Sequence, residues 1–365
     1  MTYTGSSMHE TRVRRGFDLT TSKLSQKFAT FAERECRDSS PLYESLSLHI
    51  SQDDELLEIG NVAREDQPVP NLLFGAVHYL LMQGNDHPLK DYYPSIVRDA
   101  NPVTESFESF KSFCLTYRNE IESILSSKRV QTNEVRRCAY LYPAFGYIHQ
   151  KTRKPLALIE IGTSAGLQLL WDQYAYSYET EEVFGEVQSR LHIRSEFVGE
   201  LTPPLSSAPA PVVARIGLDL NIVDLNNEAE RLWLKSLIWP EHEERLQMFE
   251  RASSYIGEQP IDFIEGDGIS RLSGLVGSIP EGSTLCIFHT HVANQMTIDM
   301  KKHLLNVVEE IGQTRDVFHL YNNIQDKDLH LDEYVNGVKR EQTIAETDGH
   351  GRWFRWLLKD EAVLT

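Results

Sequence analysis

Several features that would assign this chain to a class of protein directly are missing from its sequence. No apolar run approaches the roughly 18 residues that a membrane-spanning helix needs, so we expect no association with a membrane. The segment before Arg15 lacks the apolar core of a signal peptide, which predicts a cytoplasmic protein. No two cysteines form a C-x-x-C pair, and their widely spaced positions predict buried free thiols rather than disulfides or a zinc site.

The chain also lacks a block of lysine and arginine. Its 54 acidic residues outnumber its 36 basic ones, which gives a formal net charge of −18. Such a chain repels a phosphate backbone, and the one adjacent pair that we considered, Arg136 and Arg137, lies within a helical pattern. The sequence therefore predicts a small molecule or a protein as the partner, and no nucleic acid.

The 365 residues show two kinds of pattern, and together they predict an α/β protein of two domains. Apolar residues at helical spacing, with no convincing parallel strand, predict a helical N-terminal or cap domain over 1–150. From 151 to 365 strands alternate with helices, which predicts a doubly wound, mostly parallel, Rossmann-like sheet with a C-terminal antiparallel hairpin. Residues 172–211, rich in tyrosine, charge and proline, are interpreted as an insertion in the second domain.

The second domain opens with the sequence PLALIEIGTSAGLQLLW at 155–171, which predicts a buried strand, a glycine turn and a helix. Two chemistries use such a turn. Read as Glu160-x-Gly162-x-x-x-Gly166, it resembles the first motif of S-adenosylmethionine-dependent methyltransferases. Read as G-x-S-x-G around Ser164, it matches the nucleophile elbow of an α/β-hydrolase esterase.

The position of the turn in the chain helps to choose between these chemistries. A hydrolase elbow follows several strands and a glycine-rich oxyanion segment, whereas this turn follows the first predicted strand. The order Ser164, Asp267, His350 satisfies the hydrolase rule, but 13 histidines and many acids make that order easy to meet by chance. We therefore favour a methyltransferase with S-adenosylmethionine as its cofactor, and keep the esterase as an alternative.

A methyltransferase sheet should present polar groups at its strand ends, because such sheets bind ligands across the carboxyl ends of their strands. We expect Asp219 to accept hydrogen bonds from the ribose hydroxyls and Gly266-Asp267 to meet the adenine. The predicted cofactor-binding residues are Glu160, Gly162, Thr163, Ser164, Gly166, Asp219, Gly266 and Asp267.

The fourth strand of this domain ends near His289 and His291, and either imidazole is a candidate catalytic base for deprotonating the methyl acceptor. If both lay on the strand they would share one face, but a metal site needs a third ligand that the spacing does not reveal, so no metal is predicted. Asn133, Glu134 and His350 are candidate substrate contacts. The acidic or asparagine-proline motif usual after the fourth strand is absent, which keeps open a nucleotide-type ligand bound without turnover.

Over nearly its full length the chain resembles a family of uncharacterised bacterial proteins, a domain of unknown function. The motifs that carry this resemblance include PVPNLL at 68–73, QTNEV at 131–135, LIEIGTSAGL at 158–167, GLDLN at 217–221, IWP at 238–240 and HGRW at 350–353. The resemblance implies a methyltransferase-like C-terminal domain by analogy of fold, and fold alone does not determine the reaction.

Overall fold

The computed structural model describes residues 22–131 and 134–359, which form two compact units. The first unit combines 1–132 with 228–246, and the second combines 133–227 with 247–365. The division therefore differs from the boundary predicted at 150. The helix α7 (Cys138–Thr152) belongs to the second unit, where its Phe145 packs against Trp171 and Phe288 at ring-centroid distances of 4.9 and 5.2 Å.

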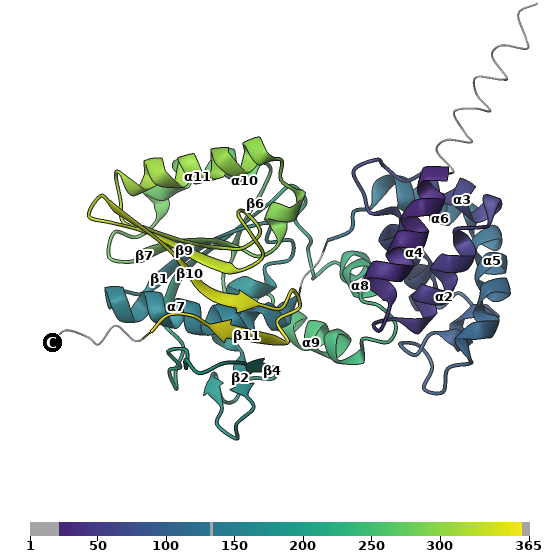
Figure 1. The fold of residues 1–365 in the computed structure, drawn as a ribbon, viewed down its shortest axis with the longest axis horizontal. Helices are drawn as coiled ribbons and strands as arrows, with labels where there is room; N and C mark the ends of the chain where they lie inside the picture. The colour runs from purple at the N-terminus through teal and green to yellow at the C-terminus, as the bar shows by residue number, and fades with distance from the viewer. Residues whose placement is uncertain (1–21, 132–133, 360–365) are drawn as a thin grey trace, which may run out of the picture. The chain divides into compact units, whose positions relative to one another are not determined.

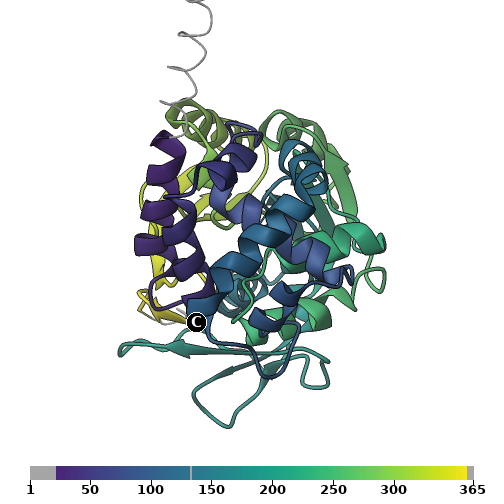
Figure 2. The same cartoon turned by 90° about the vertical axis from the view of Figure 1, so that its right-hand side faces the viewer.

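The first unit is built from helices that lie side by side, as Figures 1 and 2 show. Amphipathic spacing of leucine and aromatic residues directs one face of each helix toward a shared core. Residues 22–31 are helical, and the remaining elements are η1 (Ala32–Cys36), α2 (Pro41–Ile50), α3 (Asp54–Gly60), α4 (Val69–Met82), η2 (Pro88–Tyr92), η3 (Val103–Glu105), α5 (Ser106–Thr116), α6 (Arg118–Ser127) and α8 (Glu228–Ser236).

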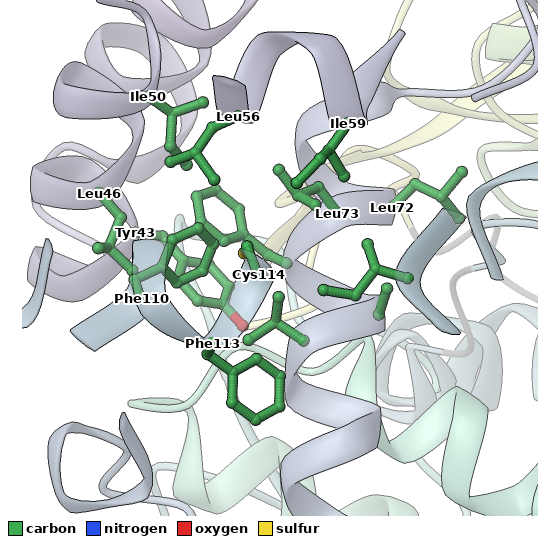
Figure 3. Close-up of a cluster of buried hydrophobic side chains, with 14 of the residues drawn as sticks. Tyr43, Leu46, Ile50, Leu56, Ile59, Leu72, Leu73, Phe110, Phe113 and Cys114 are labelled. Atoms are coloured by element: carbon green, nitrogen blue, oxygen red, sulfur yellow. The ribbon is translucent and has the colours of Figure 1, made fainter. Parts of the chain in front are cut away.

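The core of the first unit is aromatic and aliphatic (Figure 3). Tyr43 stacks on Phe74 with ring centroids 4.1 Å apart and an interplanar angle of 11°. Phe110 and Phe113 come from α5 and are completely buried. The aromatic spacing in the sequence therefore marks core residues, as an apolar helix face predicts.

The second unit contains a large, mostly parallel sheet with helices. Among the described residues eleven strands join in the order β3-β2-β4-β11-β10-β9-β8-β7-β1-β5-β6. Their bounds are β1 (Leu156–Ile161), β2 (Ala175–Tyr178), β3 (Phe184–Gly185), β4 (His192–Phe197), β5 (Val212–Asp219), β6 (Asp262–Glu265), β7 (Thr284–His289), β8 (Val317–Tyr321), β9 (Leu329–Val335), β10 (Val338–Thr347) and β11 (Trp353–Trp356). Besides α7, the helical elements of this unit are η4 (Val135–Arg137), η5 (Leu167–Gln173), α10 (Gly268–Leu275), η6 (Val276–Ser278), η7 (Val292–Gln295) and α11 (Ile298–Gly312), and α9 (Glu243–Ser253) crosses the division between the units.

Strands β6, β5, β1, β7 and β8 are consecutive neighbours and run parallel. The chain builds outward from β1 in one direction through β5 and β6, and in the other through β7 and β8. Helices α10 and α11 cover one face of this part of the sheet and α7 the other (Figure 1). Strand β10 pairs antiparallel with both β9 and β11, so the predicted C-terminal hairpin is present.

Two features of the second unit differ from the sequence prediction. The stretch 172–211 contains β2, β3 and β4, which extend the sheet beyond β11. The predicted helix after the glycine turn is instead η5, a short 3₁₀ segment whose Leu170 leaves helical geometry. Strand β2 begins two residues after η5 ends, so the connection from the glycine turn to the next strand is short.

Candidate functional site

The glycine turn after β1 is held against the end of β5. Gly162 and Gly166 have φ of +78° and +76°, a left-handed conformation that favours glycine. Ser164 shares it at +50°, and its backbone N–H donates to a carboxylate oxygen of Asp219 at 2.8 Å. The structure therefore brings the turn and the predicted ribose acceptor together, although Asp219 lies 55 positions after Ser164.

The carboxyl group of Glu160 is buried below this turn. The hydroxyl of Thr163 donates to it at 2.6 Å, and the Thr163 side chain fills the space that the missing side chain of Gly217 leaves on β5. Burial raises the pKa of Glu160 to about 8, with the nearby charge of Asp219 acting in the same direction and the Thr163 hydroxyl and Arg137 opposing it. Glu160 is therefore a proton-carrying group at neutral pH.

Gly266 and Asp267 follow β6, the neighbour of β5. The N–H of Gly266 donates to the carbonyl of Asp219 at 2.8 Å, so the ends of β5 and β6 are joined by their backbones. The carboxylate of Asp267 accepts from the N–H of Ile269 and caps α10. Asp267 thus stands at the expected strand end, with a structural role in the helix cap.

The two candidate histidines do not share a face of the sheet. Strand β7 ends at His289, and His291 has a φ of +62° in the turn that follows. Glu160 is the register partner of Phe288, so the side chain of the next residue, His289, points to the opposite face, where it stacks with Tyr321. The strand ends at His289, as the sequence predicted, and His291 lies in the turn two residues later, so the shared face that both would have on one strand does not arise.

Burial makes both imidazoles weak bases. It lowers the pKa of the fully buried His289 to about 3, and that of His291 to about 3 as well, with the charges of Arg137 and His350 adding to the effect there. The N–H of His291 donates to the side-chain oxygen of Asn322 at 2.7 Å. A general base works best with a pKa near the working pH, so neither ring is well suited to that role.

Glu134 and His350, two of the candidate substrate contacts, meet directly. A carboxylate oxygen of Glu134 lies 3.1 Å from Nδ1 of His350, across 216 positions of sequence. The other Glu134 oxygen accepts from the N–H of Arg136 and caps η4. The third candidate, Asn133, lies outside the described residues.

Three residues that the sequence analysis did not select connect this pair to the glycine turn. Gln168, in η5, donates to the carbonyl of Glu134 at 3.3 Å and accepts from the hydroxyl of Thr290 at 2.9 Å. Arg137 donates to the carbonyl of Gly349 at 2.9 Å. The polar Gln168 inside the apolar run 167–171 is a signal that the sequence offers, whereas nothing in the helical pattern around Arg137 distinguishes it.

A cavity of about 670 Å³ lies beside the residues that follow Glu134 and His350. Its lining is mainly polar and charged and comes from β2, β4 and their connections together with Arg136 and Arg352. The lining arginines are Arg136, Arg194 and Arg352, and the lining glutamates are Glu179, Glu181 and Glu196.

The described residues contain no group of three or more histidine, cysteine, aspartate and glutamate side chains placed to hold a metal ion. In the same part of the chain, no helix has both the length and the apolar composition for crossing a bilayer. All four cysteines are buried and free, which confirms the expectation from their spacing; they are Cys36, Cys114, Cys138 and Cys286.

Comparison with known proteins identifies a family for almost the entire chain. No curated protein and no solved structure gives a significant match. A family model described as "Uncharacterized protein conserved in bacteria (DUF2332)" matches residues 25–356, which include both units and every described site residue above. The chain therefore belongs to this bacterial family, DUF2332.

Proposed function

We propose that this protein is a methyltransferase that binds S-adenosylmethionine at the carboxyl ends of β1, β5 and β6 and methylates a small molecule or a protein. The observation that carries the proposal is the hydrogen bond between the glycine turn and the acid of the neighbouring strand, from Ser164 N–H to Asp219 at 2.8 Å. It supports a single ligand-binding edge formed by the turn and the acid, the arrangement that an adenosyl group requires.

The strand order supports this position for the ligand. In open α/β sheets, ligands bind outside the carboxyl ends of the strands where the strand order reverses, and here β1, which carries the glycine turn, borders that point on the side facing β7. We classify the second unit as Rossmann-like and methyltransferase-like on this basis, behind a helical N-terminal domain. The parallel order β6-β5-β1-β7-β8 is the feature that favours this classification.

The short η5 segment favours an adenosyl ligand without a diphosphate. Dinucleotide sites place the pyrophosphate at the N-terminus of the helix that follows the glycine turn, where backbone N–H groups point at the anion. Here the turn leads into seven residues of 3₁₀ geometry rather than into an α-helix. S-adenosylmethionine has no phosphate and does not need that helix.

The charges around the turn suit the two ends of S-adenosylmethionine. Asp219 would accept from the ribose hydroxyls, since a carboxylate oxygen can accept more than one hydrogen bond. The guanidinium of Arg137, near Thr290 and Gly349, would pair with the carboxylate of the methionine part. The charge of Asp219 raises the pKa of Glu160 and that of Arg137 lowers it. A cationic sulfonium or ammonium nearby would favour the ionised form of Glu160.

The contacts of the three esterase candidates favour the cofactor interpretation of the turn. A nucleophile elbow exposes its serine at the top of the sheet, whereas Ser164 is only 3% exposed. Asp267 caps α10, and His350 lies against Glu134. Asp267 and His350 thus make their hydrogen bonds to other groups and not to each other or to Ser164.

Isothermal titration calorimetry with S-adenosylmethionine and S-adenosylhomocysteine tests the proposal, with NAD and ATP as comparison ligands. We expect Asp219→Ala to weaken binding of the first two at least about 100-fold, since a lost charge-assisted pair of hydrogen bonds is worth roughly 3 kcal/mol. Asp316→Ala is the matched control, because Asp316 also accepts a backbone N–H, that of Asn336, but lies at the start of β8. If neither adenosyl compound binds at millimolar concentration, the proposal is contradicted.

The same calorimetry can also measure the number of protons that Glu160 releases when the ligand binds. Glu160, with a pKa of about 8, is mostly protonated at pH 7, and a cationic ligand should lower its pKa and release the proton. The binding enthalpy should then change with the ionisation enthalpy of the buffer in the wild type and not in Glu160→Gln. Equal buffer dependence in both proteins would remove Glu160 from the ligand site.

A further inference from the structure

The Glu134–His350 pair has the geometry of a carboxylate that orients an imidazole. Glu134 has a side chain only 2% exposed, whereas that of His350 is 47% exposed. A carboxylate oxygen accepts hydrogen bonds, so at 3.1 Å it holds the hydrogen on Nδ1 of His350. The other ring nitrogen, Nε2, then carries the lone pair that can accept a proton.

The turn that carries His350 is fixed on three sides. Gly351 has a φ of +73°, and an added Cβ would lie 2.6 Å from the carbonyl oxygen of Arg136. The hydroxyl of Ser195 donates to the carbonyl of Gly351 at 2.8 Å. Asp348 accepts from the N–H of His350 and from the guanidinium of Arg352. The imidazole is therefore presented by a preorganised turn, as a catalytic group requires.

The same turn is connected to the ligand edge. Nε of Arg137 donates to the carbonyl of Gly349, and Nη1 of Arg137 lies 3.5 Å from the hydroxyl of Thr290. An added Cβ on Gly349 would lie 3.5 Å from His291. The titratable and charged groups around His350 are Glu134, Arg137, His291, Asp348 and Arg352. Arg136 and Arg352, each two positions after one member of the Glu134–His350 pair, line the 670 Å³ cavity.

We propose that His350 is the general base for methyl transfer, that Glu134 positions it, and that the acceptor presents a hydroxyl or amine nucleophile to Nε2 of His350. This inference rests on the proposed function. Nε2 of His350 takes the proton of the acceptor O–H or N–H while the oxygen or nitrogen lone pair forms a bond to the methyl carbon. The methyl carbon–sulfur bond breaks, its electron pair stays on sulfur, and S-adenosylhomocysteine leaves with the methylated acceptor.

The tautomer of His350 gives a test that needs no substrate. Long-range ¹⁵N–¹H NMR of the neutral side chains should show His350 with hydrogen on Nδ1, and His350→Ala assigns the signal. His49 is an internal reference, because its Nδ1 lies 2.8 Å from the carbonyl of Ser45 and must also donate. In Glu134→Ala, His350 should change to the Nε2–H form that free imidazole side chains prefer, while His49 stays unchanged.

Glu333→Ala is the matched control for the loss of a buried carboxylate. Glu333 is 5% exposed and accepts from Lys151 at 2.6 Å, and its removal should leave the His350 tautomer unchanged. An Nε2–H tautomer in the wild type overturns the proposal. So does a His350 signal that Glu333→Ala changes as much as Glu134→Ala does.

Turnover separates this proposal from the function on which it rests. S-adenosylhomocysteine formation is measured with a panel of phenols, catechols and primary amines as probe acceptors. His350→Gln should lower kcat about 100-fold or more while the affinity for S-adenosylmethionine changes less than about twofold, because loss of a general base costs 10²–10⁴ in rate. If the kcat of His350→Gln equals that of the wild type, the assignment of His350 as the base is overturned. A protein that does not bind S-adenosylmethionine contradicts the proposed function instead, whatever tautomer His350 adopts.

Discussion

The two units bury different kinds of residue. Among the described residues of the first unit, the buried side chains are apolar or aromatic apart from four serines and His78, and none is a buried aspartate, glutamate, lysine or arginine. Within the described part of the second unit, eight such residues are buried: Glu134, Arg136, Arg137, Glu160, Asp172, Arg215, Asp332 and Glu333. Burial of a charged group costs free energy unless it is paired, and the unit that bears this cost is the one in which we propose the ligand site.

The buried histidines show the same contrast. His78 in the first unit has both ring nitrogens in hydrogen bonds, to the carbonyl of Ser236 at 2.9 Å and the hydroxyl of Ser95 at 2.8 Å. His289 and His319 in the second unit are completely buried, and their ring nitrogens have no hydrogen-bond partner among the described residues. The contrast applies to the histidines, because buried side-chain atoms of Tyr43, Asn61 and Tyr93 in the first unit also have no hydrogen-bond partner among the described residues.

The largest expected effect comes from the buried carboxyl of Glu160. Its pKa of about 8 in the folded protein exceeds the ordinary 4.5, so the folded state holds a proton that the unfolded state loses between these values. The free energy of unfolding should therefore fall as pH rises from about 4.5 to 8, by at most on the order of 5 kcal/mol from this group.

Glu160→Gln should remove this dependence, because the amide oxygen still accepts from Thr163 and does not ionise. Urea unfolding of both proteins at several pH values measures the difference, which should favour the variant increasingly up to pH 8. A difference that stays constant with pH would mean that Glu160 is already ionised in the folded protein.

The next largest effect is a loss of stability from a substitution in the core of the first unit. Phe74 stacks on Tyr43 and contacts Phe28, Phe31 and Phe110, so Phe74→Ala should leave a cavity and cost about 3–5 kcal/mol of stability. Thermal unfolding measures the loss. Phe74→Leu is the milder control, and calorimetry well below the transition should show unchanged affinity for S-adenosylmethionine. A large loss of affinity would show that the first unit also shapes the ligand site.

Replacement of one histidine in each unit sharpens the contrast between them. His78→Phe removes two hydrogen bonds and should cost roughly 1–3 kcal/mol at pH 7. His289→Phe removes none that the structure describes and should change stability by less than about 1.5 kcal/mol. Chemical denaturation of the two variants measures both values, and equal costs would contradict the distinction.

The acid dependence of stability checks His289 separately. Its folded pKa of about 3 lies below the ordinary 6.5, so the unfolded state takes up a proton first and stability is lost as pH falls from 6.5 toward 3. His289→Phe should therefore lose less stability than the wild type on acidification. Parallel curves for the two proteins would show that His289 is not held neutral by burial.

The smallest effect concerns the helix caps, one in each unit. Asp53 caps α3 and Asp267 caps α10, and replacement of either by alanine should cost about 1 kcal/mol. Asp267→Asn, which keeps a capping oxygen, is the control. If Asp267 also contacts the adenine, Asp267→Ala should weaken binding of S-adenosylmethionine, whereas Asp53→Ala should not. Unchanged affinity in both variants would leave Asp267 as a cap alone.

Much of the architecture was accessible from periodicity. Buried strands such as β1 and β7 are continuous apolar runs, and parallel strands covered on both faces require this pattern. The strands β2 and β4 were missed because tyrosine, serine and charged residues dominate them, and because β4 joins the main sheet through β11, which lies far away in sequence. The η5 segment was predicted as a helix since its apolar residues do not reveal that a strand follows within two residues.

The candidate site divides in the same way. The glycine turn could be recognised because positive φ at Gly162 and Gly166 is a local constraint on the backbone. The end of β7 at His289 agrees with the sequence prediction, whereas the positive φ of His291 in the following turn is not visible in the sequence pattern. Arg137 and Thr290 entered the site only through contacts that no spacing predicts.

The sequence by itself determined the membership of the family, the parallel strands and the turn after β1, because each depends on residues close together in the chain. Only the tertiary structure decided that Asp219 meets Ser164 and that Glu134 meets His350, 55 and 216 positions apart. The physical reason is that side-chain hydrogen bonds depend on distance in space. Strand order and loop geometry set that distance, and neither is recorded in local sequence pattern.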